Sequence, residues 1–348
     1  MKNKIKADMS EVKRNSFRAW WLASRPKTLA GAAAPVIVGG AFACSVMKFL
    51  ALQDKHVAAL SFEEMRSWLF ALLIPFCLCL LFALLMQIDA NFVNDYFDFK
   101  KGTDREDRLG PERACAQGWI APDAMRKGIV ITTVLSCLVG IGILCWAWQY
   151  ELLIVGVLCV AGCFLYTTKF SYIGLGDVLV VLFFGLVPVA CTTYVATKGN
   201  YYDLPLILAG LAMGLATDTL LVVNNYRDRN QDAVSGKRTV IVRIMDKMVH
   251  TLGETRGRKE GEQICQDLYM WLGVFATLIA IVALFLFPLT SIKYPFMLVY
   301  LILHFKALRK FQSLDGRELN KVLGVTARNI FIFGVMMALS VMMGVMGL

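Results

Sequence analysis

The chain has 348 residues, of which 57% are hydrophobic, and its mean hydropathy is +0.59. These values exclude an ordinary soluble domain. The formal charge of +10 does not call for nucleic acid, because basic loops beside anionic lipid account for it. Three scattered histidines and ten cysteines without a C-x-x-C pair argue against a haem or zinc site.

Apolar runs of roughly 20 residues, long enough to cross a bilayer, recur along the whole chain. They predict an all-α, polytopic membrane protein of about nine transmembrane helices. In chain order the predicted spans are residues 28–49, 67–91, 128–148, 150–168, 175–197, 204–224, 268–287, 294–307 and 325–347. The eighth is the weakest, because it is short and contains His304 and Lys306.

Two segments outside the spans are polar. Residues 1–27 are basic, and Trp20 and Trp21 stand among the basic residues, which predicts an interfacial arm on the cytoplasmic membrane surface. Residues 28–348 are expected to form one transmembrane domain. Within it, the charged stretch 233–266 has helical potential and is expected to cap the cytoplasmic mouth.

Lysine and arginine are distributed unevenly between the connections. They are dense in the N-terminal arm and in the connections after the second, sixth and eighth spans. The connections after the first, third, fifth and seventh spans together hold only Lys48, Lys55, Arg66, Lys198 and Lys293. Because basic residues favour the cytoplasmic side, we expect the N-terminus inside, the C-terminus outside and a location in the cytoplasmic (inner) membrane.

A first polar cluster, NFVNDYFD, begins at Asn91, where the second apolar run ends. On a helix, Asn91, Asp95 and Asp98 are spaced i, i+4, i+7 and share one face. Polar groups at membrane depth read as functional, and their oxygens suit Mg²⁺, which often combines few carboxylates with substrate phosphates. The alternative is a helix end that meets water, although the helix dipole disfavours acids there.

A second cluster, NNYRDRNQD, begins at Asn224, where the sixth run ends. Asp228 and Asp232 are four positions apart, and Asn224 lies one turn before Asp228 on the same face. Both runs pass from outside to inside, so both clusters are expected at the cytoplasmic end. Together they can hold Mg²⁺ ions and, through them, a diphosphate; a solvated loop is the alternative for either cluster alone.

Basic residues follow both clusters, as expected beside a diphosphate leaving group. These residues are Lys100, Lys101, Arg108, Arg113, Arg227, Lys237 and Arg238. Taken singly, each is also explained by its cytoplasmic loop. Further inward candidates are Tyr166, Lys169, Asp177 and Asp218. Asp177 also suits a helix N-terminus, and Asp218 either pairs with a basic residue or lines the cavity.

The chain resembles the UbiA superfamily of intramembrane prenyltransferases over about residues 18–345. That family carries an N-x-x-x-D-x-x-D type first motif and a D-x-x-x-D second motif on a nine-helix bundle. More narrowly, the chain looks like the 1,4-dihydroxy-2-naphthoate branch of menaquinone synthesis. The strings that carry the resemblance are RPKTL from Arg25, NDYFDFKKGTD from Asn94, RLGPER from Arg108, GLGD from Gly174, FFGLVPV from Phe183, NNYRD from Asn224 and GKRTV from Gly236.

The resemblance implies roles for individual residues. Mg²⁺ and diphosphate would be bound by Asn91, Asp95, Asp98, Asp228 and Asp232. The predicted catalytic residues are Asp95, Asp228 and Lys237. The predicted substrate-binding residues are Asn91, Arg113, Tyr166, Lys169, Asn224, Arg227 and Arg238. Asp104, Asp218 and the 246–266 segment receive no role.

The expected reaction is Mg²⁺-dependent transfer of a polyprenyl chain from its diphosphate to 1,4-dihydroxy-2-naphthoate, with loss of the ring carboxylate as CO₂. The implied partners are these two substrates and membrane lipid. Another acceptor of the superfamily is the alternative: 4-hydroxybenzoate, homogentisate, haem or a glycerol phosphate. A membrane transporter is the rival from a different class, because polar clusters at helix ends also suit transporters. Prenyl chain length and oligomeric state stay open.

Overall fold

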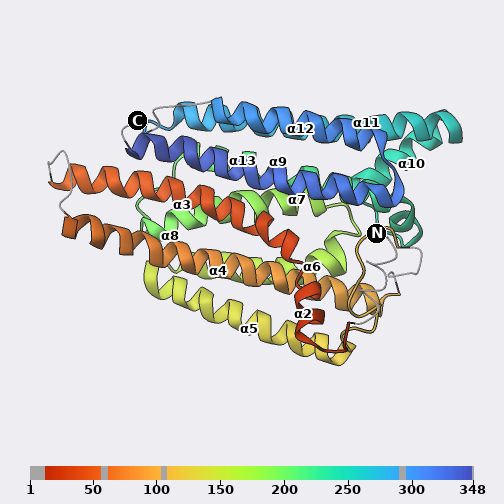
Figure 1. Cartoon of the computed structure of the whole chain (residues 1–348), viewed down its shortest axis with the longest axis horizontal. Helices are drawn as coiled ribbons and strands as arrows, with labels where there is room; N and C mark the ends of the chain where they lie inside the picture. Colours follow the sequence, from red (N-terminus) through yellow and green to blue (C-terminus); the bar gives the residue numbers. More distant parts are fainter. Residues whose placement is uncertain (1–11, 56–61, 103–107, 290–294, 347–348) are drawn as a thin grey trace.

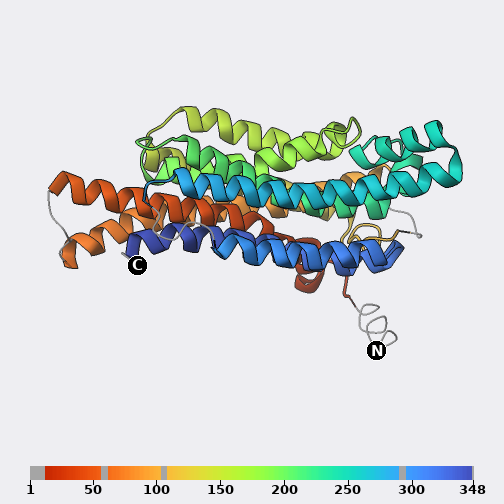
Figure 2. The same ribbon diagram turned by 90° about the horizontal axis from the view of Figure 1, so that it is seen from above.

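The computed structural model describes residues 12–55, 62–102, 108–289 and 295–346. Every regular element in these ranges is a helix, so the all-α prediction is confirmed. The long helices run side by side along one axis (Figure 1, Figure 2). In chain order they are α2 (Phe17–Ala23), α3 (Pro26–Lys55), α4 (Phe62–Lys100), α5 (Pro122–Ala147), α6 (Glu151–Leu165), the π-helix η1 (Tyr166–Phe170), α7 (Gly176–Val181), the π-helix η2 (Leu182–Leu186), α8 (Val187–Ala196), α9 (Leu204–Val234), α10 (Val240–Leu252), α11 (Glu254–Leu286), α12 (Pro295–Ser313), the 3₁₀ turn η3 (Gly316–Glu318) and α13 (Leu319–Met346).

Eight helical stretches within the described ranges are long and apolar enough to cross a membrane, so the multi-pass prediction is confirmed. α12 is not among them, since its C-terminal half carries Lys306, Arg309 and Lys310. A 19-residue helix nevertheless forms there and packs against both α11 and α13. The ninth span therefore stays a prediction.

Two helices form the centre of the bundle. The most apolar windows of α3 and α9 are 72% and 67% buried, whereas those of α4, α5 and α6 are at most 17% buried. Phe42 of α3 and Met213 of α9 belong to one large apolar core. On α5 and α6, side chains such as Leu138 and Ile154 are exposed. In a membrane these faces contact hydrocarbon.

Glycines allow close packing of helices at several places in the bundle. A Cβ on Gly39 of α3 would lie 2.5 Å from the carbonyl oxygen of Val189 in α8. A Cβ on Gly185 of η2 would clash with the backbone of Gly210 and Gly214 in α9. The helices therefore approach at backbone distance, as small residues permit in membrane bundles.

The N-terminal arm packs on the bundle. Residues 1–11 lie outside the described ranges, and α2 follows them. Trp20 meets Phe92 of α4 edge to face, with ring centroids 5.3 Å apart, and Ala19 and Ala23 are buried. Trp21 is exposed. Its location at a membrane interface stays a prediction.

The charged segment 233–266 is helical, as expected, but its last part belongs to the seventh span. α11 runs without a break from Glu254, because Gly257 and Gly261 pack against Met248 and Met245 of α10 instead of interrupting the helix. This helical hairpin lies at the end of the bundle where α9 ends (Figure 1). Its function as a cap stays a prediction.

Candidate active site

Lys237 joins the two polar clusters. α4 carries Asp98 and α9 carries Asp232 to the same end of the bundle. The Lys237 ammonium lies 3.9 Å from Asp98 Oδ1 and 3.8 Å from Asp232 Oδ1. The two carboxylates, 134 positions apart along the chain, therefore share one cation.

A turn at the end of α9 directs Lys237 back to the site. Gly236 has φ +77°, and its N–H donates to the Ala233 carbonyl over 3.2 Å. The Lys237 N–H donates to the Asp232 carbonyl over 2.8 Å. This pair of bonds is the Schellman motif, which requires a left-handed residue after the helix. The GK pair of the sequence therefore places the ammonium beside the last acid of its own helix.

The two carboxylates keep Lys237 protonated. Burial lowers the pKa of Lys237, but the Asp98 and Asp232 carboxylates raise it more, so its pKa stands above the ordinary lysine value. Arg113 adds a second cation: its Nη2 donates to Asp98 Oδ2 over 2.9 Å, and both side chains are buried. Asp98 thus lies between Arg113 and Lys237.

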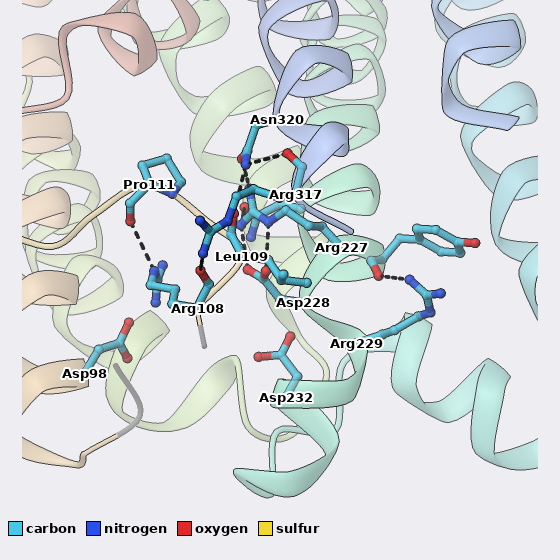
Figure 3. Close-up of polar contacts among 12 residues, drawn as sticks. Asp98, Arg108, Leu109, Pro111, Arg227, Asp228, Arg229, Asp232, Arg317 and Asn320 are labelled. Atoms are coloured by element: carbon cyan, nitrogen blue, oxygen red, sulfur yellow. Dashed lines mark hydrogen bonds and ion pairs between the residues drawn. The ribbon is translucent and has the colours of Figure 1, made fainter. Parts of the chain in front are cut away.

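Asp228 has a cation of its own. Arg227 donates to both its oxygens, over 2.8 Å from Nε and 2.6 Å from Nη2. The same guanidinium donates to Asn224 Oδ1 and to Asn320 Oδ1, each over 2.8 Å. Arg227 is only 2% exposed. It therefore ties the second cluster to the start of α13 (Figure 3).

Residues 108–113, the RLGPER string, pack against Arg227 and the start of α13. Asn320 Nδ2 donates to the Leu109 carbonyl over 2.8 Å, and Arg317 donates to the Arg108 carbonyl over 3.0 Å. A Cβ on Gly110 would lie 2.8 Å from Arg227 Nη2, so a larger residue here would displace the Arg227 guanidinium. The RLGPER string thus packs between the two clusters (Figure 3).

Asn91 and Asp95 make hydrogen bonds of their own, apart from Lys237. Asn91 Nδ2 donates to the Ser24 carbonyl over 2.9 Å and to Thr28 Oγ1 over 3.1 Å. Asp95 accepts from the backbone N–H groups of Ala114 and Cys115 over 2.8 and 2.9 Å. The stripe predicted with Asp98 therefore divides. Asn91 and Asp95 hold the α2–α3 junction and the 113–118 segment, and the structure does not bring them to Lys237.

The remaining predicted residues also divide. Asn224 lies beside Asp228, held by Arg227. Tyr166 and Lys169 belong to η1, where Tyr166 is half-buried and Lys169 exposed. Arg238 turns away and pairs with Asp246 of α10 over 2.5 Å on the exposed surface. Asp104 lies outside the described residues.

Three contributors were not predicted. Asn94 shares a face with Asp98, four positions on, and its Oδ1 accepts from Thr167 over 2.5 Å. Its place in the NDYFD string was a usable signal. Arg317 comes from the turn η3 and Asn320 from the start of α13, and no motif marks either residue, so their part in the site follows only from tertiary packing.

The donor set suits Mg²⁺ only together with a phosphate ligand. Within the described residues, no three acidic, histidine or cysteine side chains are grouped to hold a metal ion alone. Asp98, Asp228 and Asp232 nevertheless supply carboxylate oxygens from two helices, and the charges of Asp98 and Asp228 both act on Asp232. Mg²⁺ sites commonly combine one or two carboxylates with substrate phosphates. The residues present fit that kind of site.

Fold and site together define a polytopic membrane enzyme with acids and cations gathered at one end. The chain belongs to the UbiA prenyltransferase family, whose model matches residues 56–334. It is a prenyltransferase. This confirms the resemblance drawn from the two polar motifs.

Curated relatives narrow the comparison. A 1,4-dihydroxy-2-naphthoate octaprenyltransferase of Escherichia coli K12 is 34% identical over 275 residues, covering 75% of this chain and 79% of the relative. The Haemophilus influenzae protein of the same name is 32% identical over 236 residues, covering 66% and 70%. UbiA prenyltransferase domain-containing protein 1 of Rattus norvegicus is 28% identical, covering 51% and 52%.

Two solved structures share the fold. A digeranylgeranylglyceryl phosphate synthase aligns over 93% of this chain and 98% of its own, with a TM-score of 0.54 and 14% identity. A UbiA homologue from Archaeoglobus fulgidus, bound to DMAPP and Mg²⁺, aligns over 92% and 98%, with a TM-score of 0.51 and 13% identity. At these identities the likeness concerns the fold alone.

Proposed function

We propose that this protein transfers a polyprenyl chain from its diphosphate to 1,4-dihydroxy-2-naphthoate, with loss of the ring carboxylate and dependence on Mg²⁺. One observation carries the proposal: Asp98 and Asp232 meet across Lys237, with Arg113 and the Arg227–Asp228 pair at the same end. The names of the bacterial relatives support the acceptor.

Asp98, Asp228 and Asp232 are the residues that would hold Mg²⁺. The Archaeoglobus fulgidus homologue, which has the same fold and is bound to DMAPP and Mg²⁺, supports a dependence on Mg²⁺. When bound, the metal would neutralise charge on the departing diphosphate. Asn91 and Asp95 would act as positioning residues, because their hydrogen bonds fix the segments around the first cluster.

Lys237 and Arg113 would bind the diphosphate directly. Both now neutralise carboxylates, and both can donate to phosphate oxygens as those oxygens gain charge. Such donors contribute to rate because their bonds strengthen as the allylic C–O bond breaks. The raised pKa of Lys237 keeps it an ammonium for this task.

The bundle would exclude water from the cationic allylic carbon. The prenyl chain would lie among apolar side chains, and the acceptor ring would attack the carbon before water could. The new C–C bond replaces the ring C–CO₂⁻ bond, whose electron pair stays on the ring as CO₂ leaves. Diphosphate departs with the electrons of the C–O bond, so charge and atoms balance.

The test is product analysis with an acceptor panel. Purified protein in nanodiscs receives geranylgeranyl diphosphate, Mg²⁺ and either 1,4-dihydroxy-2-naphthoate, 4-hydroxybenzoate or homogentisate. We expect a prenylated, decarboxylated product from the naphthoate alone, and none with EDTA. Prenylation of 4-hydroxybenzoate instead would overturn the acceptor, and substrate uptake into vesicles without any prenylated product would favour a transporter.

A further inference from the structure

Asp218 is a buried carboxylate with no part in the site described above. It lies in α9, ten positions before Asp228, which is about 15 Å along a helix. Its side chain is 4% exposed, and among the described residues no hydrogen-bond donor reaches its Oδ1. An unpaired polar atom at this depth is costly, so native structures normally supply it with a partner.

The packing of α7 on α9 shows where Asp218 points. A Cβ on Gly214 would lie 2.6 Å from the Val181 carbonyl oxygen, and a Cβ on Gly176 would lie 3.5 Å from Leu221 Cδ2. The two helices are therefore antiparallel neighbours. Gly214, Asp218 and Leu221 follow each other at four and three positions and share one face of α9. Asp218 thus faces α7, between these two contacts.

Asp177 is the matching acid on α7. It stands between Gly176 and Val181, opposite Asp218, and the charges of the two carboxylates repel one another. We call Asp177 and Asp218 the inner acid pair. Two acids so placed can both accept hydrogen bonds, and neither supplies a donor to the other when both are ionised.

Tyr166 connects the inner acid pair with the diphosphate site. Its hydroxyl lies 3.7 Å from the Cβ position of Gly176, at the start of α7. The charges of Asp177 and Asp218 act on this hydroxyl, and so do those of Asp98 and Asp232. Tyr166 therefore stands between the two sets of acids.

The helix that carries Asp177 is irregular on both sides. The π-helix η1 precedes it and the π-helix η2 follows it, each five residues long. Such π segments are rare and are found frequently at functional sites. This observation is independent of the acids and points to the same part of the bundle.

We propose that the inner acid pair is the binding site for a ring hydroxyl of the aromatic acceptor. The proposal rests on the proposed function. A phenolic hydroxyl supplies the donor that Asp218 Oδ1 lacks, and a hydrogen bond to a carboxylate is a strong one.

The test pairs a substitution with a change in the acceptor. Initial rates are measured for wild type, Asp218→Asn and Asp177→Asn with 1,4-dihydroxy-2-naphthoate and with its 1-O-methyl and 4-O-methyl ethers. In wild type, one methyl ether should raise KM about tenfold to a hundredfold. Asp218→Asn should raise KM for the parent acceptor by at least several-fold. It should also reduce the ratio of KM for that ether to KM for the parent acceptor. KM for the prenyl diphosphate should stay within about twofold.

Asp89→Asn is the matched control. Asp89 is a fully buried acid of α4 whose oxygens accept from Thr132 and Thr133 of α5, so its loss should leave acceptor KM unchanged. Thermal unfolding checks that each variant folds, and Asp177→Asn carries the test if Asp218→Asn does not. Wild-type acceptor KM and an unchanged ether penalty in both variants would overturn the inner acid pair while the proposed function stands. No prenylated aromatic from wild type would overturn both.

Discussion

At the scale of single residues, the acids of the site are paired with cations in two different ways. Lys237 serves Asp98 and Asp232 together, whereas Arg227 is committed to Asp228 and two asparagines. Contacts of 3.8–3.9 Å leave the Lys237 ammonium free to move toward a phosphate, while the bidentate Arg227 pair is rigid. Lys237 is therefore the mobile cation and Arg227 the fixed one.

The carboxylates should be indispensable for turnover. We expect Asp98→Asn and Asp232→Asn each to lower kcat/KM by at least about a hundredfold, because each removes a metal ligand charge. Tm should fall as well, because the buried cations Arg113 and Lys237 lose part of their counter-charge, so rates are compared at a temperature where each variant is folded. Asp123→Asn, in an exposed pair on α5, is the control and should retain wild-type activity. Wild-type rates in Asp98→Asn and Asp232→Asn would disprove the assignment.

The raised pKa of Lys237 gives a pH prediction. A raised folded-state pKa means that its stabilisation is complete below the unfolded value, about 10.4, and is lost as pH rises through the folded value. Lys237→Met should therefore lower Tm by the same amount at every pH between about 7 and 9. The measurement is thermal unfolding of both proteins across this range. If the Tm difference between the two proteins becomes smaller by pH 9, Asp98 and Asp232 do not raise the pKa of Lys237.

At the scale of elements, the end of α9 shows how a turn places a catalytic group. Gly236 adopts a conformation that L-residues rarely take, and no other atom would touch an added Cβ. A substitution there changes the backbone without a steric clash. Gly253, at the end of α10, also has a positive φ (+78°) and free surroundings, but its ψ is 169°, outside the left-handed helical region, and no predicted site residue follows it.

These two glycines provide a matched comparison. Both Gly236→Ala and Gly253→Ala should lower stability, because alanine is strained at a positive φ; the cost at Gly236 is about 1–2 kcal/mol, and the cost at Gly253, whose ψ is 169°, is at least as large. Only Gly236→Ala should also lower kcat/KM, by displacing Lys237, and Gly236→Asn should restore part of it. The measurements are Tm and initial rates. Equal kcat/KM in both alanine variants would show that this turn does not position the ammonium.

The positions of the long helices follow from the sequence. The contacts of α4 and the two π-helices do not, for physical reasons. Span length and apolarity located every long helix, and the clusters of α4 and α9 do continue as helices. The contacts made by the polar face of α4 do not follow from the sequence. Asn91 and Asp95 were grouped with Asp98 by spacing, yet spacing does not say which neighbour each part of a face meets. η1 and η2 have no local signal, since π turns arise from packing around α7.

At the scale of the whole molecule, α12 decides the topology. It lies beside α11 and α13 along the length of the bundle (Figure 1, Figure 2), although its charge excludes it from the eight clearly apolar spans. His304, stacked on Tyr269 with ring centroids 4.6 Å apart, is 1% exposed. The polar ring that weakened this span in the sequence is thus packed between helices.

A crossing α12 places the two termini on opposite sides. With the N-terminus in the cytoplasm, alkaline phosphatase fused after Leu348 should be active in the periplasm, and a green fluorescent protein fused there should stay dark. An N-terminal fluorescent fusion is the control and should be bright. A bright C-terminal fusion would mean that only eight segments cross.

The contacts of Arg227 with Asn320 have a consequence for biosynthesis. The acids of α4 leave the ribosome more than two hundred residues before the turn that begins α13, the last helix. Until that helix inserts, the nascent chain lacks the partner that closes the RLGPER segment over the second cluster. We therefore expect this enzyme to mature late, and a transcript cut short before residue 320 to yield inserted but inactive protein.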